Sequence, residues 1–480
     1  MQLVQLFRDQ TVLARRPALP DSVAGLHYDS RRIQPGWAFF AIRGEVSDGN
    51  AFIAQARARG ATLIVSDQAS TEADIRVPNA RVALAQASAN WFGRPAEKLR
   101  LVGITGTNGK TTTAFLVEAM MRAAGLTTGL VGTIEYHIGE RVLPSPHTTP
   151  ESYDLQALLA QMVESGCGAA VMEVSSHALA MERVWSCPFE VGVFTNLTQD
   201  HLDFHGSMEN YRAAKHRLFT GLGAPPPPQA VVNADDPAAQ TMLEGYQGVV
   251  RRFGFSSAAD LRASEAEYLP VGSRFAVNGQ SFATPLLGRV NVLNTLAALG
   301  VARALGIDEA AQRRGMAALT RVPGRFERVF RGQPFMVAVD YAHTPDALAH
   351  LLALARELAP RPARVLVVFG CGGDRDRGKR PLMGRAAAQA ADWVMVTSDN
   401  PRSEKPEAII AEILSGSPEA LHDPDRHAAI RLAVAEARPG DIVIIAGKGH
   451  EHYQIIGDQR IDFDDAAEAG AALAELGWKE

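Results

Sequence analysis

The sequence predicts an α/β protein of three domains, and three observations predict it. A strand, a glycine-rich TGTNGKTT loop and a helix follow one another from residue 101. Apolar strands then alternate with helical stretches, which indicates a mostly parallel sheet covered on both faces. A second alternating series begins after residue 322 and predicts a Rossmann-like doubly wound domain. We expect a smaller amino-terminal α/β domain to precede them.

The length of 480 residues is too great for one ordinary core, so two to four domains are expected. Residues 94–97 resemble a link, and residues 322–324 resemble a second break. We therefore divide the chain into residues 1–97, 98–322 and 323–480.

Composition excludes several classes of function. A net charge of −5 gives no general reason to expect nucleic acid or an anionic membrane as a partner. The three cysteines lack metal-ligand spacing and fit a reducing compartment. Since no apolar run resembles a secretory signal or a membrane span, we expect a cytoplasmic protein without membrane insertion.

The strands and helices follow from apolar runs. In the first domain, a helix is predicted over 50–59 and a strand over 61–65. The second has predicted strands at 101–104, 169–172, 191–194 and 230–232, helices at 111–124 and 208–219, and a proline-rich loop at 225–228. The third has predicted strands at 336–339, 365–369, 393–396 and 442–445.

The glycine-rich loop is the strongest chemical signal. Its backbone amides and the helix start after it can bind phosphate oxygens. Lys110 can neutralise β- and γ-phosphate charge, and the Thr111 hydroxyl can ligate Mg²⁺. Ile104 occupies the position where the usual pattern has its first glycine. The alternative is a glycine-rich turn without a ligand.

Polar groups follow two further strands of the second domain. Glu173 ends one strand and can hold the nucleotide's Mg²⁺ or cap a turn. His201 lies in a loop with three other ionisable groups, which predicts metal ligands or a solvated loop. Lys215 lies on a helical stretch, where a lysine is usually on a solvated face.

Other polar residues have two interpretations each. Asn291 and Asn294 lie one helical turn apart and can reach one ligand, or serve as a cap and a surface amide. Arg325 can contact phosphate or pair with an acid. In the third domain, Asp340 and the segments 370–377, 398–402 and 446–451 follow strands, where ligands bind in doubly wound sheets. The arginines in segments 370–377 and 398–402 favour a carboxylate-bearing substrate over surface turns.

Together these motifs resemble the Mur ligase family, and within it the members that add meso-diaminopimelate. The resemblance extends from end to end. The motifs are DSR at 29–31, GTNGKTT at 106–112, HTTP at 147–150, EVSSH at 173–177, NLTQDHLDFHG at 196–206, YRAAK at 211–215, NVLN at 291–294, PGRFE at 323–327, DYAHTPDAL at 340–348, GCGGDRDRGKRP at 370–381, DNPR at 399–402 and AGKGHE at 446–451.

The resemblance implies a UDP-binding domain, a central ATPase and an amino-acid-binding domain, in that order. It implies that the D-glutamate carboxylate of UDP-MurNAc-L-Ala-D-Glu attacks the γ-phosphate of ATP, which gives ADP and an acyl phosphate. The amine of meso-diaminopimelate then displaces phosphate, in the synthesis of peptidoglycan precursors. Two Mg²⁺ ions with ATP and a monomeric enzyme are expected.

The resemblance also assigns residues. The catalytic set is Lys110, Glu173, His201 and Lys215, and the last of these would be carbamylated and serve the metal with Thr111, Glu173 and His201. ATP would be bound by Gly106, Thr107, Asn108, Gly109, Lys110, Thr111, Thr112, Asn291, Asn294, Arg325 and Asp340. The UDP-MurNAc-dipeptide would be bound by Ser30, Thr148, Thr149, Ser175 and Arg183. Diaminopimelate would be bound by Arg375, Asp399, Asn400, Arg402, Gly447 and Glu451.

Two positions bear on specificity. Arg402 can pair with the carboxylate that distinguishes diaminopimelate from lysine. Lysine-adding relatives lack this arginine, because a buried arginine without a partner would be costly there. Met181 stands where relatives can have a glutamine that contacts the muramoyl peptide, and a thioether cannot replace the amide's hydrogen bonds.

Three alternative functions explain less of the sequence. A folylpolyglutamate synthetase shares the GTNGK loop but explains neither DSR nor DNPR. A lysine-adding Mur ligase is disfavoured by Arg402. A nucleotide-gated regulatory protein without ligase activity does not account for the acidic and basic groups at the facing strand ends.

Overall fold

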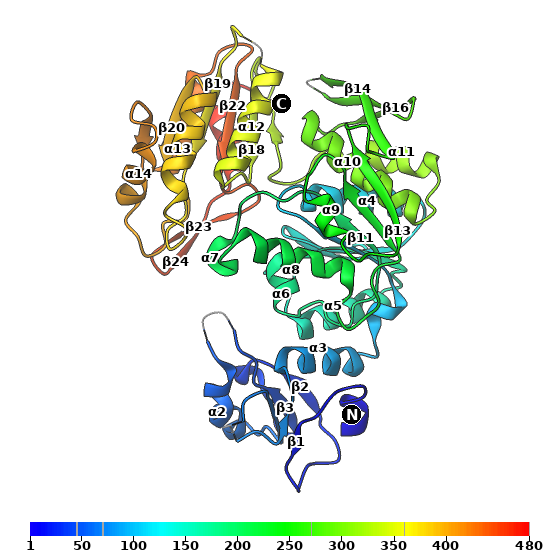
Figure 1. Cartoon of the computed structure of the whole chain (residues 1–480). Coiled ribbons are helices and arrows are strands. Elements are labelled where there is room, and N and C mark those ends of the chain that lie inside the picture. Colours follow the sequence, from blue (N-terminus) through cyan, green and yellow to red (C-terminus); the bar gives the residue numbers. More distant parts are fainter. Residues whose placement is uncertain (45–46, 70–71, 270, 360, 480) are drawn as a thin grey trace.

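The computed structural model describes residues 1–44, 47–69, 72–269, 271–359 and 361–479, and it folds them around three large sheets and one two-stranded sheet (Figure 1). Each large sheet is formed by one continuous part of the chain. The three parts lie one after another, with the amino-terminal unit in blue, the central unit in cyan to green and the carboxyl-terminal unit in yellow to red (Figure 1). All predicted site residues lie within the described ranges.

The amino-terminal unit contains a five-stranded sheet of order β1-β5-β4-β3-β2, in which only β1 is antiparallel to its neighbour. Helix α3 is capped by Asn79 and packs against α5 of the central unit. The elements are α1 (Leu3–Leu6), β1 (Ala14–Arg15), β2 (Gly25–His27), η1 (Ser30–Arg32), β3 (Trp37–Phe40), η2 (Gly49–Phe52), α2 (Ile53–Ala58), β4 (Leu63–Ser66), β5 (Ile75–Arg76), α3 (Ala80–Trp91) and η3 (Pro95–Lys98).

The central unit contains an eleven-stranded sheet of order β16-β15-β14-β13-β12-β11-β6-β10-β7-β8-β9. Its middle strands are parallel, and antiparallel hairpins extend both edges. The strands are β6 (Arg100–Thr105), β7 (Thr128–Val131), β8 (Glu135–Ile138), β9 (Arg141–Pro144), β10 (Ala169–Glu173), β11 (Phe189–Phe194), β12 (Gln229–Asn233), β13 (Val249–Gly254), β14 (Leu261–Leu269), β15 (Gly272–Val277) and β16 (Gln280–Thr284). The helices are α4 (Lys110–Ala123), α5 (Ser152–Glu164), α6 (Ser176–Ala180), α7 (Leu202–His205), α8 (Met208–Thr220), α9 (Ala239–Met242), α10 (Gly288–Ala304) and α11 (Glu309–Ala318).

Helices cover both faces of this sheet because successive residues of a strand point to opposite sides. On β6, Val102 packs in one core with α4 and α10, whereas Leu101 packs in another with α5 and α8. Neither side of the middle strands is left to solvent, which explains why these strands consist of almost uninterrupted apolar residues.

The carboxyl-terminal unit contains a six-stranded sheet of order β17-β18-β22-β19-β20-β21, parallel except at β17. Helices α12, α13 and α14 pack on one face, and α15 and α16 pack on the other. The elements are β17 (Glu327–Val329), β18 (Met336–Asp340), α12 (Pro345–Leu358), β19 (Val365–Phe369), α13 (Lys379–Ala390), β20 (Trp393–Thr397), α14 (Pro406–Leu414), β21 (Leu421–Asp423), α15 (Arg426–Glu436), β22 (Ile442–Ala446), β23 (Tyr453–Ile456), β24 (Gln459–Asp462) and α16 (Asp465–Glu475).

The predicted α/β class with mostly parallel sheets is confirmed, and two details differ. The helix predicted over 50–59 begins as the 3-10 turn η2, because the Asp48 carboxylate accepts a hydrogen bond from the backbone N–H of Asn50 and tightens the first turn. The antiparallel edge strands β8, β9 and β14–β16 were not predicted. None of the described helices combines the length and the apolar character that a membrane span requires.

Candidate active site

The glycine-rich loop connects β6 to α4. Two of its glycines lie so close to neighbouring atoms that any larger residue would force the backbone or its neighbours to shift. Gly106 has φ +146° and Gly109 has φ +83°. A Cβ atom at Gly106 would lie 1.9 Å from Thr195 Oγ1, and one at Gly109 would lie 2.3 Å from Asn294 Oδ1. The loop therefore follows a path open only to glycine, which places the backbone close to its neighbours.

The loop is anchored by the segment that follows β11. The side chain of Asn196 accepts a hydrogen bond from the backbone N–H of Asn108 (2.8 Å), and its backbone carbonyl accepts one from the N–H of Thr107 (2.9 Å). Thr195 Oγ1 donates to the Asn108 carbonyl at 2.7 Å. These contacts join segments almost 90 residues apart, so the sequence pattern did not single out Thr195 or Asn196.

Lys110 lies at the mouth of the loop. Its Nζ donates to the carbonyls of Gly106 (3.0 Å) and Thr107 (2.8 Å). Burial lowers the pKa of Lys110, although the charges of Glu173 and Asp200 oppose this shift. The ammonium is thus held by two neutral carbonyls, and a bound phosphate would offer it a stronger, charged acceptor.

Glu173 ends β10 and is fully buried beside the start of α4. Its carboxylate accepts hydrogen bonds from Thr111 Oγ1 (3.0 Å), the Thr133 backbone N–H (2.7 Å) and Thr133 Oγ1 (3.1 Å). A carboxylate and a hydroxyl are ligands that Mg²⁺ accepts, with substrate phosphates and water completing its coordination. Within the described ranges no group of three or more histidine, cysteine, aspartate or glutamate side chains could hold a metal ion.

Lys215 is buried on α8. The prediction from spacing alone, which places this lysine on a solvated helix face, is therefore wrong. Its Nζ donates to the Gly106 carbonyl at 2.8 Å and lies 4.4 Å from the centre of the Tyr211 ring. Burial, and then the charge of Lys110, lowers the pKa of Lys215 well below its usual value. The amine lies directly against the phosphate loop, where the neutral form is favoured.

His201 and Tyr211 connect this lysine to the loop after β11. The His201 ring lies edge-on to Tyr211, with centroids 6.2 Å apart, and Tyr211 Oη lies 3.1 Å from Thr107 Oγ1. His201 has φ +53°, and burial lowers its pKa although Asp200 opposes the shift. Tyr211 thus contacts Lys215, His201 and the phosphate loop. Because aromatic residues on helices are common in hydrophobic cores, the sequence around Tyr211 did not indicate a role in the site.

The boundary between the central and carboxyl-terminal units brings further predicted residues to the loop. Asn294 and Asn291 lie side by side on α10, with a hydrogen bond of 3.0 Å between their amides. Arg325 Nη2 donates to Thr111 Oγ1 at 3.3 Å, and its guanidinium lies 4.7 Å from the centre of the Tyr341 ring. An arginine from one unit therefore contacts the phosphate loop of the other.

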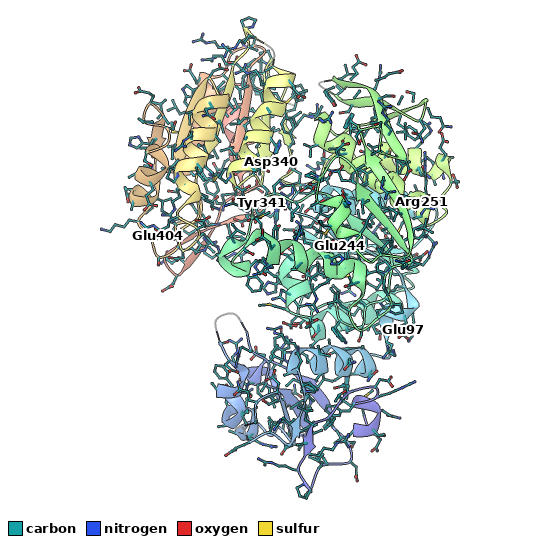
Figure 2. The ribbon with its side chains drawn as sticks, viewed as in Figure 1. Glu97, Glu244, Arg251, Asp340, Tyr341 and Glu404 are labelled. Atoms are coloured by element: carbon teal, nitrogen blue, oxygen red, sulfur yellow. The ribbon has the colours of Figure 1, made fainter. Side chains whose placement is uncertain are left out.

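Asp340 ends β18, and both of its carboxylate oxygens accept backbone N–H bonds, from Phe326 (2.7 Å) and Ala342 (2.8 Å). Burial raises its pKa. Asp340 and Tyr341 lie on the side of the carboxyl-terminal unit nearest the central unit (Figure 2). Asp340 therefore shapes the turns that position Arg325 and Tyr341, and its role in nucleotide binding stays a prediction.

A cavity of about 910 Å³ opens between these two units, a size typical of small-molecule sites. Its lining is mostly apolar and includes Leu286, Leu287, Asn291, Arg325, Phe326 and Met336. Two predicted nucleotide contacts, Asn291 and Arg325, thus line this mostly apolar cavity.

Four of the five residues predicted to bind the muramoyl dipeptide lie around Glu173. Thr148 Oγ1 is 3.1 Å from Thr133 Oγ1, and Thr149 Oγ1 donates to the Glu173 carbonyl at 2.8 Å. The Ser175 backbone N–H donates to Thr149 Oγ1 at 3.1 Å, and Arg183 Nη1 donates to the Thr149 carbonyl at 3.2 Å. Ser30, the fifth, is buried in the amino-terminal unit, where its hydroxyl donates to Gln55 at 2.6 Å.

Met181 is buried and lies between two arginines. Arg183 Nη2 is 3.4 Å from its sulfur, and Arg81 Nη1 of the amino-terminal unit is 3.4 Å from its carbonyl oxygen. Both arginines also approach Glu151, at 2.8 Å from Arg81 and 3.6 Å from Arg183. The position where a glutamine was expected is therefore flanked by cationic donors, and Arg81 was missing from the sequence prediction.

Five of the six predicted diaminopimelate residues form one cluster at the carboxyl ends of β20 and β22. Asn400 Nδ2 donates to Glu451 Oε2 at 2.8 Å, and a Cβ atom at Gly447 would lie 2.8 Å from Asp399 Oδ2. Arg402, at φ +51°, donates from Nη1 to the Gly373 carbonyl at 2.7 Å. Of the described contacts in this cluster none involves Arg375, which is exposed on the neighbouring loop.

Comparisons with known proteins agree over nearly the whole chain. Family models match residues 22–99 (Mur ligase family, catalytic domain), 104–302 (Mur ligase middle domain) and 324–449 (Mur ligase, glutamate ligase domain).

Two relatives carry the name UDP-N-acetylmuramoyl-L-alanyl-D-glutamate–2,6-diaminopimelate ligase. The protein from Solibacter usitatus is 50% identical, with 97% of both chains covered, and that from Syntrophomonas wolfei is 44% identical, with 98% of this chain and 99% of the relative covered. A solved structure of the same name has a TM-score of 0.70 at 34% identity, with 99% of both chains covered. The chain therefore belongs to the Mur ligase family.

Proposed function

We propose that this chain is the ATP-dependent ligase that joins meso-diaminopimelate to UDP-N-acetylmuramoyl-L-alanyl-D-glutamate, with release of ADP and phosphate, in peptidoglycan precursor synthesis. Residues 1–97 bind the UDP end, residues 98–322 bind ATP, and residues 323–480 bind the amino acid. The observation that carries the proposal is the contact between Arg325 and Thr111. It links the phosphate loop to the unit that holds the Asp399–Arg402 cluster, so both substrates can meet at one boundary.

The chemistry requires a carboxylate to become an electrophile. The D-glutamate carboxylate attacks the γ-phosphate of ATP, the bond to the β-phosphate breaks, and ADP leaves. The diaminopimelate amine then attacks the acyl phosphate carbonyl, loses a proton and expels phosphate. Because two anions must approach each other in the first step, the protein mainly positions them and screens charge.

Lys110 and Arg325 supply the fixed positive charge. Lys110 leaves its two carbonyl partners for the β- and γ-phosphates, while Arg325 approaches them from the other unit. The apolar cavity beside Asn291 receives the adenine ring. Glu173 and Thr111, with His201, would hold Mg²⁺, which would neutralise phosphate charge when bound.

Lys215 is proposed to carry a carbamate. A neutral amine attacks CO₂, forms an N–C bond and loses one proton, which converts a potential cation into an anion. The lowered pKa of Lys215 supports this, because burial favours the neutral amine that reacts with CO₂. A negative group at this position would balance a second Mg²⁺ near the phosphate loop.

Arg402 is proposed to bind the carboxylate that lysine lacks, and its replacement tests the choice of acceptor. In Arg402→Ala, we expect the KM for meso-diaminopimelate to rise about 100-fold, because a charged bidentate contact is lost. The KM for ATP should change less than about threefold. Both constants are measured from diaminopimelate-dependent phosphate release. Equal increases for the two substrates would contradict the role of Arg402.

A further inference from the structure

Lys448, which none of the assignments above includes, is a fully buried cation within the predicted amino-acid site. Its Nζ donates to Asn400 Oδ1 at 3.1 Å and lies 3.2 Å from Glu451 Oε2. A buried ammonium is stable only with such partners. We propose that Lys448 is a positioning residue that fixes Asn400 and Glu451 for the incoming amino acid. This inference rests on the proposed function.

The first consequence concerns the Asn400 amide. Its Oδ1 accepts two hydrogen bonds, from Lys448 Nζ and from the Ile455 backbone N–H at 2.9 Å. The amide nitrogen must therefore face the opposite way, where one of its N–H groups donates to Glu451. The orientation of an asparagine amide depends on such a network. Without Lys448, only the Ile455 N–H would hold Oδ1 in place.

The second consequence concerns charge. Asp399 and Glu451 place two carboxylates in the site, and Lys448 offsets one of them. Burial raises the pKa of Asp399, but the charges of Lys448 and Arg426, together with smaller contributions from the Asn400 backbone N–H and His343, lower it overall. Arg426 is itself paired with buried Asp465 at 2.7 Å. One carboxylate is then left to pair with the ammonium group of the amino acid, while Arg402 is left to pair with a substrate carboxylate.

Within the described part of the chain, the hydrogen-bond and ring contacts of Lys448 lie in the carboxyl-terminal unit. Its charge lies 5.5 Å from the centre of the Tyr453 ring, and its two hydrogen-bond partners both belong to the predicted diaminopimelate set. Since none of these residues was predicted to contact ATP, the loss of Lys448 should affect one substrate selectively.

The test uses the full-length enzyme and Lys448→Met, which keeps much of the side-chain length without the charge. We expect the KM for meso-diaminopimelate to rise about 10- to 100-fold, with the KM for ATP and for the UDP-linked substrate within about twofold of wild type. Lys448→Arg should recover part of the loss. Lys405→Met, the same change at an exposed position of this unit, is the control and should behave as wild type. An unchanged KM for meso-diaminopimelate, or an equal rise for ATP, would overturn the proposal.

A double-variant cycle separates positioning from general stability. If Lys448 acts through Glu451, the Lys448→Met/Glu451→Gln enzyme should have a KM for meso-diaminopimelate within about threefold of Glu451→Gln alone. If the KM increase of the double variant equals the product of the increases in the two single variants, the proposal is overturned. The double variant removes the Lys448 charge together with that of its ion-pair partner Glu451, so Glu451 is not left as an unpaired buried carboxylate, and the variant carries the test even if Lys448→Met does not fold.

The two proposals fail differently. A wild-type enzyme that never releases phosphate with meso-diaminopimelate would refute the proposed function. A fully active wild type together with an unaffected Lys448→Met enzyme would refute only the role of Lys448.

Discussion

Replacing Lys215 by alanine is expected to lower kcat about 10³-fold or more, and short carboxylic acids such as acetate should restore part of the activity. The amine lies against the Gly106 carbonyl and the Tyr211 ring, so its carbamate would bring a negative charge to the phosphate loop. An added acid can enter the space that alanine leaves and supply a similar charge. The measurement is diaminopimelate-dependent phosphate release with increasing acetate.

The control is Lys405→Ala, which removes an exposed lysine and should remain fully active with or without acetate. Thermal unfolding of both variants separates a folding defect from a catalytic one. If Lys215→Ala keeps full activity, the carbamate hypothesis fails.

Replacing Lys110 by methionine should also reduce kcat about 10³-fold, because the positive charge at the β- and γ-phosphates is lost. Methionine retains much of the side-chain volume, so the loop bounded by Gly106 and Gly109 should keep its path. The KM for meso-diaminopimelate should stay within about threefold of wild type, since the proposed amino-acid site lies in another unit. Steady-state phosphate release at varied ATP and diaminopimelate provides both constants.

This result separates Lys110 from Arg402. The first variant should lose turnover at saturating substrates, whereas Arg402→Ala should lose mainly diaminopimelate affinity. A Lys110→Met enzyme that regains full kcat at high ATP concentration would show that the lysine contributes only to ground-state binding.

Much of the fold could be predicted because the buried strands have a simple pattern. Strands β6, β10, β11, β19 and β22 are covered on both faces and appear as continuous apolar runs. Strand β14, which lies between β13 and β15, is buried at only some positions, so its sequence resembles a polar loop. Antiparallel hairpins of this kind depend on pairing between strands that a local pattern does not reveal.

The candidate site was predicted in two ways, with different limits. The phosphate loop and Glu173 could be placed from local sequence, because strand, loop and helix fix where they lie. Lys215 could not, because burial of a helical lysine depends on what packs over it. Only the family resemblance singled it out.

Tyr211, Arg81 and Lys448 were missed for the same physical reason. Each acts through contacts with segments distant in the sequence, such as the 3.1 Å approach of Tyr211 to Thr107 across 104 positions. In the sequence, an aromatic residue, an arginine or a lysine at these positions looks like an ordinary core or surface residue. Their significance appears only when the strand ends are brought together.

The central claim, amide formation between a UDP-linked glutamate and meso-diaminopimelate, is tested most directly by an acceptor panel. Phosphate and ADP are measured with ATP, Mg²⁺ and UDP-MurNAc-L-Ala-D-Glu, in the presence of meso-diaminopimelate, of L-lysine or of no amino acid. We predict sustained release with meso-diaminopimelate, at least about 100-fold less at equal L-lysine, and none without an acceptor. Release with ATP alone, or no release with any acceptor, would contradict the ligase account.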